Sequence, residues 1–125
     1  MQITTPVAEE LNRYLDLSSL ELKATAENMA NVDTPGYRTT GFDFAAEMSR
    51  SIEDLQGREG GTAASLPSPP LADVDGLLER PDGNNVSMDR EGMKMAEAQL
   101  QFRTGVELMK REFTRELDAI HEDQK

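Results

Sequence analysis

The side chains best suited to chemistry in this sequence are its carboxylates and a single histidine. Residues 73–77 and 82–86 combine Asp with Gly or Asn in short runs that invite comparison with a calcium-binding loop. Both runs fail at the fifth position of such a loop and lack the spaced glutamate that completes the coordination. His121 has no Ser/Asp or Cys partners from which a catalytic set could be built, and no Gly-rich phosphate loop precedes a helix. We therefore expect no catalytic, cofactor-binding or metal-binding residue, and no enzyme.

The composition argues against several other kinds of partner. The formal net charge is −11, whereas nucleic acid requires a clustered basic face and anionic lipid attracts basic segments. The chain has no cysteine, which excludes disulfides and thiolate metal sites. The first residues lack the basic and apolar regions of a cleaved signal peptide, and no apolar run approaches the length of a membrane span. We expect no nucleic acid and no direct lipid binding.

A long amphipathic helix is expected over residues 5–32. Thr5 suits the N-cap position and Pro6 the first helical position. Residues at alternating spacings of four and three then form a seam like that of a coiled coil, with polar interruptions. The seam positions are Leu11, Leu15, Ser18, Leu22, Thr25, Met29 and Val32.

A second long helix is expected over residues 87–121. Ser87 suits its N-cap, and Asp89 and Glu91 follow where the positive end of the helix dipole favours acids. Gly105 within this helix costs about 1 kcal/mol relative to Ala, and it either permits close approach of another helix or has no special role. We expect one side of its apolar surface to contact the first helix and the other to contact neighbouring molecules. The apolar residues are Leu100, Phe102, Val106, Met109, Phe113, Leu117 and Ile120.

Residues 33–86 differ from both helices. A turn opens this segment, and apolar residues at helical spacing predict a short helix over Phe44 to Leu55. Residues 57–80 are rich in Gly, Pro, Ser and Asp, which disfavours regular structure. We expect this stretch to be a mobile loop, because it has little apolar surface to offset the entropy of ordering.

Together these elements predict an all-α fold in a single unit of residues 1–125. The two long amphipathic helices are expected to run antiparallel, in the manner of a coiled coil, and to be joined by a long, mostly irregular loop. Only 37% of the residues are hydrophobic and 5% aromatic, so a thick core is not expected. We therefore expect an elongated molecule whose apolar stripes are completed by partners, rather than a small helical bundle.

The most specific segment of the sequence is residues 28–38, NMANVDTPGYR. Pro35 disfavours helical geometry at the preceding residue, so the first helix should stop before it. Pro35 and Gly36 suit the central positions of a type II turn, with Gly36 at positive φ. Asn28 and Asn31 are open to two interpretations: caps at a polar helix end, or side chains whose hydrogen bonds fix the turn between helix and loop in an assembled state.

Residues 28–38 also resemble the Asn-x-Ala-Asn-x-x-Thr-Pro-Gly-Tyr element that follows the N-terminal helix in bacterial flagellar rod and hook proteins. The matching residues are Asn28, Ala30, Asn31, Thr34, Pro35, Gly36 and Tyr37. A second block, residues 81–102, resembles the start of the C-terminal helix in the proximal rod members of this family, the FlgB type. Its matching residues include Asp82, Gly83, Asn84, Val86 and Met88.

The resemblance implies a structural subunit of the flagellar basal-body rod. Such subunits leave the cell through the flagellar type III export apparatus without a cleaved signal peptide, and they assemble into a hollow shaft through their terminal helices. The implied partners are identical subunits, other rod proteins and the rod–export-gate adaptor. Phe42 and Phe44 are candidates for an export-gate recognition element, with simple packing as the alternative. The expected assembly interface comprises Leu11, Leu15, Leu22, Met29 and the apolar residues of the second helix named above.

Two alternatives remain open from the sequence. The chain could be a small cytoplasmic helical adaptor or export chaperone, although such a protein would not need the segment at residues 28–38. It could also be a neighbouring rod paralogue, because several axial proteins share the first block.

Overall fold

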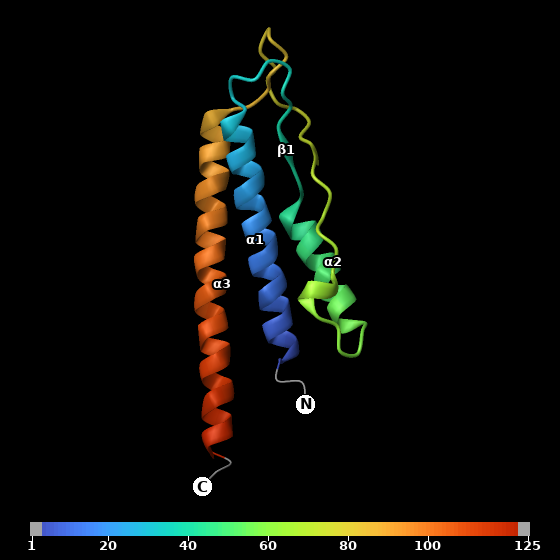
Figure 1. Cartoon of the computed structure of the whole chain (residues 1–125), viewed down its shortest axis with the longest axis vertical. Helices are drawn as coiled ribbons and strands as arrows, with labels where there is room; N and C mark the ends of the chain where they lie inside the picture. The colour runs from blue at the N-terminus through green and yellow to red at the C-terminus, as the bar shows by residue number, and fades with distance from the viewer. Residues whose placement is uncertain (1–3, 123–125) are drawn as a thin grey trace.

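The computed structural model describes residues 4–122 and contains three α-helices arranged in an elongated shape (Figure 1). The six residues 1–3 and 123–125, which the expected unit of 1–125 includes, lie outside the described residues. The elements in chain order are α1 (Pro6–Ala30), β1 (Thr40–Gly41), α2 (Phe44–Gln56), a 3-10 turn η1 (Ala63–Ser65), β2 (Ala72–Asp73) and α3 (Met88–Glu122).

The start and end of α1 follow from its local sequence. The Thr5 hydroxyl accepts a hydrogen bond from the Ala8 N–H at 3.2 Å, as an N-cap should, and Pro6 takes the first helical position. At the other end Asn31 is the C-cap, and its side-chain amide donates to the Glu27 carbonyl at 2.8 Å. The expected helix over residues 5–32 is therefore confirmed, two residues shorter at its end.

The helix α3 runs antiparallel to α1 and is the longest element (Figure 1). It ends at Glu122, one residue beyond the expected 121, and the Ser87 hydroxyl accepts from the Arg90 N–H near its start. The Thr5 hydroxyl donates to the Glu112 carboxylate at 2.9 Å, which sets the first residue of α1 level with this part of α3. Residues 113–122 therefore extend past the start of α1 by about 15 Å.

Small residues form the contact between α1 and α3. Ala8 and Ser18 of α1 and Ala98 and Gly105 of α3 are all buried. A Cβ atom at Gly105 would lie 2.7 Å from the Leu15 Cδ2 atom and 3.0 Å from a ring carbon of Tyr14. Of the two possibilities for this glycine, close approach of another helix is confirmed.

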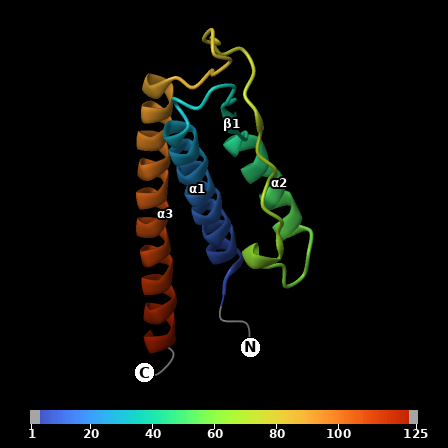
Figure 2. The same ribbon diagram turned by 45° about the horizontal axis from the view of Figure 1, so that its top comes forward.

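The helix α2 lies on the other flank of α1, so that α1 stands between α3 and α2 in both views (Figures 1 and 2). The rings of Phe44 and Tyr14 meet edge to face, with centroids 5.4 Å apart. The buried Arg13 guanidinium donates to the Ser51 hydroxyl at 2.9 Å and to the Glu47 carboxylate at 3.2 Å. The predicted short helix is confirmed, ending one residue later than expected.

The expectation of an irregular segment between the helices is partly wrong. β1 and β2 pair antiparallel, with Thr40 opposite Asp73, so the fold is mostly rather than wholly α-helical. The η1 turn also interrupts residues 57–80. The Arg13 guanidinium donates to the Pro67 carbonyl at 2.8 Å, and the Glu9 carboxylate accepts from the Ala63 N–H at 2.7 Å. Polar side chains of α1 thus hold residues 57–80 in place through hydrogen bonds. The expectation of a mobile loop was based on the low apolar content of this stretch, which does not reveal such polar contacts.

Candidate functional site: a polar junction between the two sequence motifs

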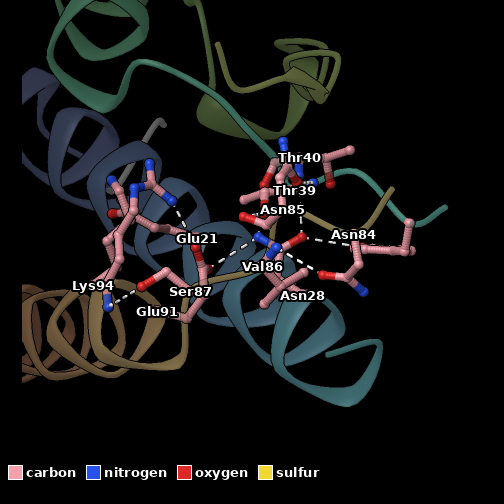
Figure 3. Close-up of polar contacts among 12 residues, drawn as sticks. Glu21, Asn28, Thr39, Thr40, Asn84, Asn85, Val86, Ser87, Glu91 and Lys94 are labelled. Carbon is pink, nitrogen blue, oxygen red and sulfur yellow. Dashed lines mark hydrogen bonds and ion pairs between the residues drawn. The ribbon is translucent and has the colours of Figure 1, made fainter. Parts of the chain in front are cut away.

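The two motif segments meet at the end of the molecule where α1 stops and α3 begins. We call their buried polar contact the polar junction, and it comprises Asn28, Thr39, Asn84, Asn85 and Glu91 (Figure 3). All five residues are at least 97% buried. Their side chains come from α1, from the chain after it and from the segment that leads into α3.

Asn28 uses its whole amide group in this junction. Its Nδ2 donates to the Thr40 carbonyl at 2.8 Å and to the Glu91 carboxylate at 3.0 Å. Its Oδ1 accepts from the Thr40 N–H at 3.1 Å and from the Tyr37 hydroxyl at 3.0 Å. One side chain therefore links α1, β1, the turn and α3, as the interpretation of a hydrogen-bonded turn requires.

Asn84 of the second motif forms hydrogen bonds with the turn of the first motif. Its Nδ2 donates to the carbonyls of Asn31 and Thr34 at 2.9 and 2.8 Å, and its Oδ1 accepts from the Val86 N–H at 2.8 Å. The Asp82 carboxylate in turn accepts from the Asn84 N–H at 3.0 Å. The two motifs are thus halves of one structure.

The backbones of the two turns also touch. The Gly36 N–H donates to the Asp82 carbonyl at 2.9 Å, and Gly36 has the positive φ of 74° that the turn was expected to need. Gly83 has a φ of 82°, and a Cβ there would lie 3.3 Å from the Gly36 Cα. Both glycines are therefore required by backbone geometry.

Thr39, Asn85 and Glu91 complete the junction, although the motifs did not single them out. The Asn85 Oδ1 accepts from the Thr39 N–H at 2.7 Å. Glu91 is fully buried, and its second carboxylate oxygen accepts from Arg90 at 2.6 Å. The preference for an acid near a helix start pointed to Glu91, but nothing in the sequence indicated its burial.

Most of the remaining motif residues are more exposed. Ala30, Thr34, Pro35 and Met88 lie at the surface, although the Thr34 hydroxyl donates to the Asn31 side chain at 3.1 Å. Val86 is buried beside the junction.

The junction has the properties of a structural joint. Its amides and carboxylates hydrogen-bond one another and the backbone, which leaves no nucleophile beside a free base. Among residues 4–122, no group of three or more His, Asp or Glu side chains is placed to hold a metal ion. Burial, and secondarily the charge of Glu21, raise the pKa of the Tyr14 phenol, so this ring stays neutral where it packs against Phe44.

The expected interface residues divide into three groups. Met109 is buried, while Leu11, Leu15, Leu22, Met29 and Val106 are half-buried. Leu100 is exposed and, two residues from Ala98, points away from α1. Four residues of α3 form an exposed stripe of large apolar side chains, which we call the exposed stripe: Phe102, Phe113, Leu117 and Ile120.

Phe42 and Phe44, the export-gate candidates, lie with ring centroids 6.4 Å apart and are both half-buried. The contact of Phe44 with Tyr14 gives it a packing role. Its proposed recognition role stays a prediction.

Comparison with known proteins identifies the family. The chain is 36% identical over 110 residues to the flagellar basal body rod protein FlgB of Salmonella typhimurium, covering 76% of this chain and 78% of the relative. It is 34% identical over 105 residues to the FlgB of Borrelia hermsii, covering 71% and 76%. The chain belongs to the FlgB family. The FlgB of Escherichia coli is 32% identical over 103 residues, covering 70% and 73%.

No model of a known protein family matches the chain. The FlgB relatives nevertheless confirm the family that the two motifs indicated, and they favour a structural rod subunit over an adaptor or an enzyme. Within residues 4–122, none of the helices has the length and apolarity needed to cross a bilayer.

Proposed function

We propose that this chain is a subunit of the proximal rod that assembles through its terminal helices after export by the flagellar type III apparatus. Its partners are identical copies, other rod proteins and the rod–export-gate adaptor. The FlgB relationship supports the rod assignment, and the shape of α3 supports assembly through this helix.

The observation that carries the proposal is that α3 has two different faces. The face toward α1 is made of small or polar residues such as Ala98, Gly105 and Glu112. Met109 is buried as well, but four other large apolar residues are rotated away from this face, so Phe102, Phe113, Leu117 and Ile120 remain 38–56% exposed. Contiguous exposed apolar residues on one side of a helix are typical of an interaction surface.

The end of α3 strengthens this argument. Residues 113–122 extend beyond the start of α1, so α1 cannot cover them (Figure 1). An isolated helical extension of about ten residues is marginally stable in water. A neighbouring subunit that covers this extension would stabilise both the helix and the assembly.

Secretion and motility test the proposal. In a strain whose chromosomal gene for this chain is deleted, the tagged wild-type chain should restore swimming. It should leave the cytoplasm only when the flagellar export apparatus is intact. Export of the chain in an export-deficient strain, or a failure to restore swimming in the parental species, would contradict it.

A further inference from the structure

The layer of three helices has two unlike faces. Each residue advances roughly 100° around an α-helix, so Leu108 lies about 120–180° around α3 from the four residues of the exposed stripe. The exposed stripe is therefore on one face of the layer. Leu108, which is 43% exposed, belongs to the other face.

This second face holds an apolar groove where all three helices approach one another. The groove has a volume of about 280 Å³ and lies near the start of α1. Its apolar lining comes from α1, α2 and α3. Two of the lining residues, Val7 and Leu108, are exposed to solvent. The lining residues are Val7, Glu10, Leu11, Tyr14, Met48, Thr104 and Leu108, so Glu10 is the charged residue at an otherwise mostly apolar groove.

The free end of α3 has the form of a helix that docks into a groove. Phe113, Leu117 and Ile120 follow the spacing i, i+4, i+7, which places three large side chains along one edge. All three are about half exposed. No part of α1 runs beside this end, so it is free to reach another molecule.

We propose that Phe113, Leu117 and Ile120 of one copy dock into the groove around Val7 and Leu108 of a second copy. The two surfaces lie on opposite faces of the layer, so a molecule does not fill its own groove. The contact is heterologous, and every added copy presents one free helix end and one free groove. Such a contact builds an open assembly rather than a closed dimer. This inference rests on the self-assembly proposed above and names the surfaces that meet.

Single cysteines test the contact cleanly because the chain has none of its own. We would prepare Val7→Cys and Leu117→Cys chains separately, mix them and oxidise them under mild conditions. Disulfide formation requires the two Cβ atoms to approach within about 4.5 Å. We expect a disulfide-linked heterodimer from the mixture, and only background linkage from either chain alone.

Leu100→Cys is the matched control, because Leu100 is on the same helix and is even more exposed, at 66% against 56% for Leu117. It should not link to Val7→Cys above background. Equal linkage with Leu100→Cys would overturn the contact. The contact would also be overturned if Leu117→Cys did not link to Val7→Cys while the wild-type chain still self-associated in sedimentation. In that case the proposed self-assembly would stand and only this contact would be wrong.

Charge substitutions give a second readout that does not depend on oxidation. Leu117→Asp should raise the dissociation constant for self-association about tenfold or more, whereas Leu100→Asp should change it less than about twofold. Equal effects of the two substitutions would refute the docking contact. If the wild-type chain does not associate at any concentration, both the contact and the self-assembly on which it rests are wrong.

Discussion

At the scale of single residues, amide side chains hold together the end of the molecule where α1 meets α3. Asn28 and Asn84 are almost completely buried and satisfy backbone groups that no regular secondary structure would pair. Buried polar groups are stabilising only when their partners are present, so each of these residues is sensitive to change.

Asn28→Ala should lower the free energy of unfolding by about 3 kcal/mol, because it leaves the Thr40 backbone and the Tyr37 hydroxyl without this partner and removes one of the two hydrogen bonds of the buried Glu91 carboxylate. Asn31→Ala is the control, since its amide makes an exposed contact to Glu27, and it should cost about 1 kcal/mol or less. Urea denaturation of the two variants measures both values. Equal costs would show that the junction does not depend on Asn28.

Arg13 has a comparable role in holding α2 and residues 57–70 on α1. Arg13→Ala should destabilise the protein by about 2–3 kcal/mol, because it removes one of the two arginines that pair with the Glu47 carboxylate and leaves the Pro67 carbonyl without this donor. Arg50 also pairs with Glu47, but from the surface, so Arg50→Ala should cost less than about 1 kcal/mol. Hydrogen exchange should show faster opening of α2 in the Arg13 variant. Unchanged protection of α2 would contradict the role assigned to Arg13.

At the scale of elements, α3 has one face that packs against α1 and another that is exposed. This division explains how a chain with a small hydrophobic core keeps its helices together and still offers an interface. Ala98 and Gly105 bring α1 close, and the large apolar side chains of the exposed stripe stay outside this contact.

The two glycines of α3 test this division. The Cβ atom that Gly92→Ala introduces would meet no neighbouring atom, so this substitution should stabilise the helix by about 0.5–1 kcal/mol. Gly105→Ala gains the same helix propensity but would press on Leu15 and Tyr14, so we expect a net loss of about 1–2 kcal/mol. Thermal melting of the two variants gives opposite shifts if α1 packs against Gly105. A shift of the same sign would show that it does not.

The elements that could be predicted from the sequence are those governed by local rules. The cap at Thr5, the turn at Pro35–Gly36 and the helical spacing of apolar residues each act over a few positions, and each was confirmed. The η1 turn, the β1–β2 pair and the buried Glu91 depend on contacts between residues far apart in the chain. No local pattern encodes such contacts, so they were missed.

The site was predictable to a similar extent. The motifs identified Asn28 and Asn84 as important, but not that they form one joint, because their separation in sequence hides their contact. The apolar pattern predicted both faces of α3. It did not predict that the buried side of α3 would consist mainly of small and polar residues, with Met109 beside them.

At the scale of the whole molecule, an elongated layer with one projecting helix end suits a subunit that is completed by its neighbours (Figures 1 and 2). Leu22→Asp should abolish motility, but Leu22 is half-buried in α1, so this substitution does not separate loss of assembly from loss of the fold. Phe113 is 49% exposed on the projecting end, so Phe113→Asp should abolish motility with the fold and export at least partly retained. Normal swimming of the Phe113 variant would argue against burial of the stripe in the rod.

The most direct test of the two-faced α3 is sedimentation velocity on the wild-type chain and Phe113→Asp over rising concentration, with circular dichroism recorded on the same samples. We predict that both chains have the same helicity when dilute, and that only the wild type forms larger species and gains helicity as concentration rises. Equal association of the two chains would show that the exposed stripe is not the assembly surface.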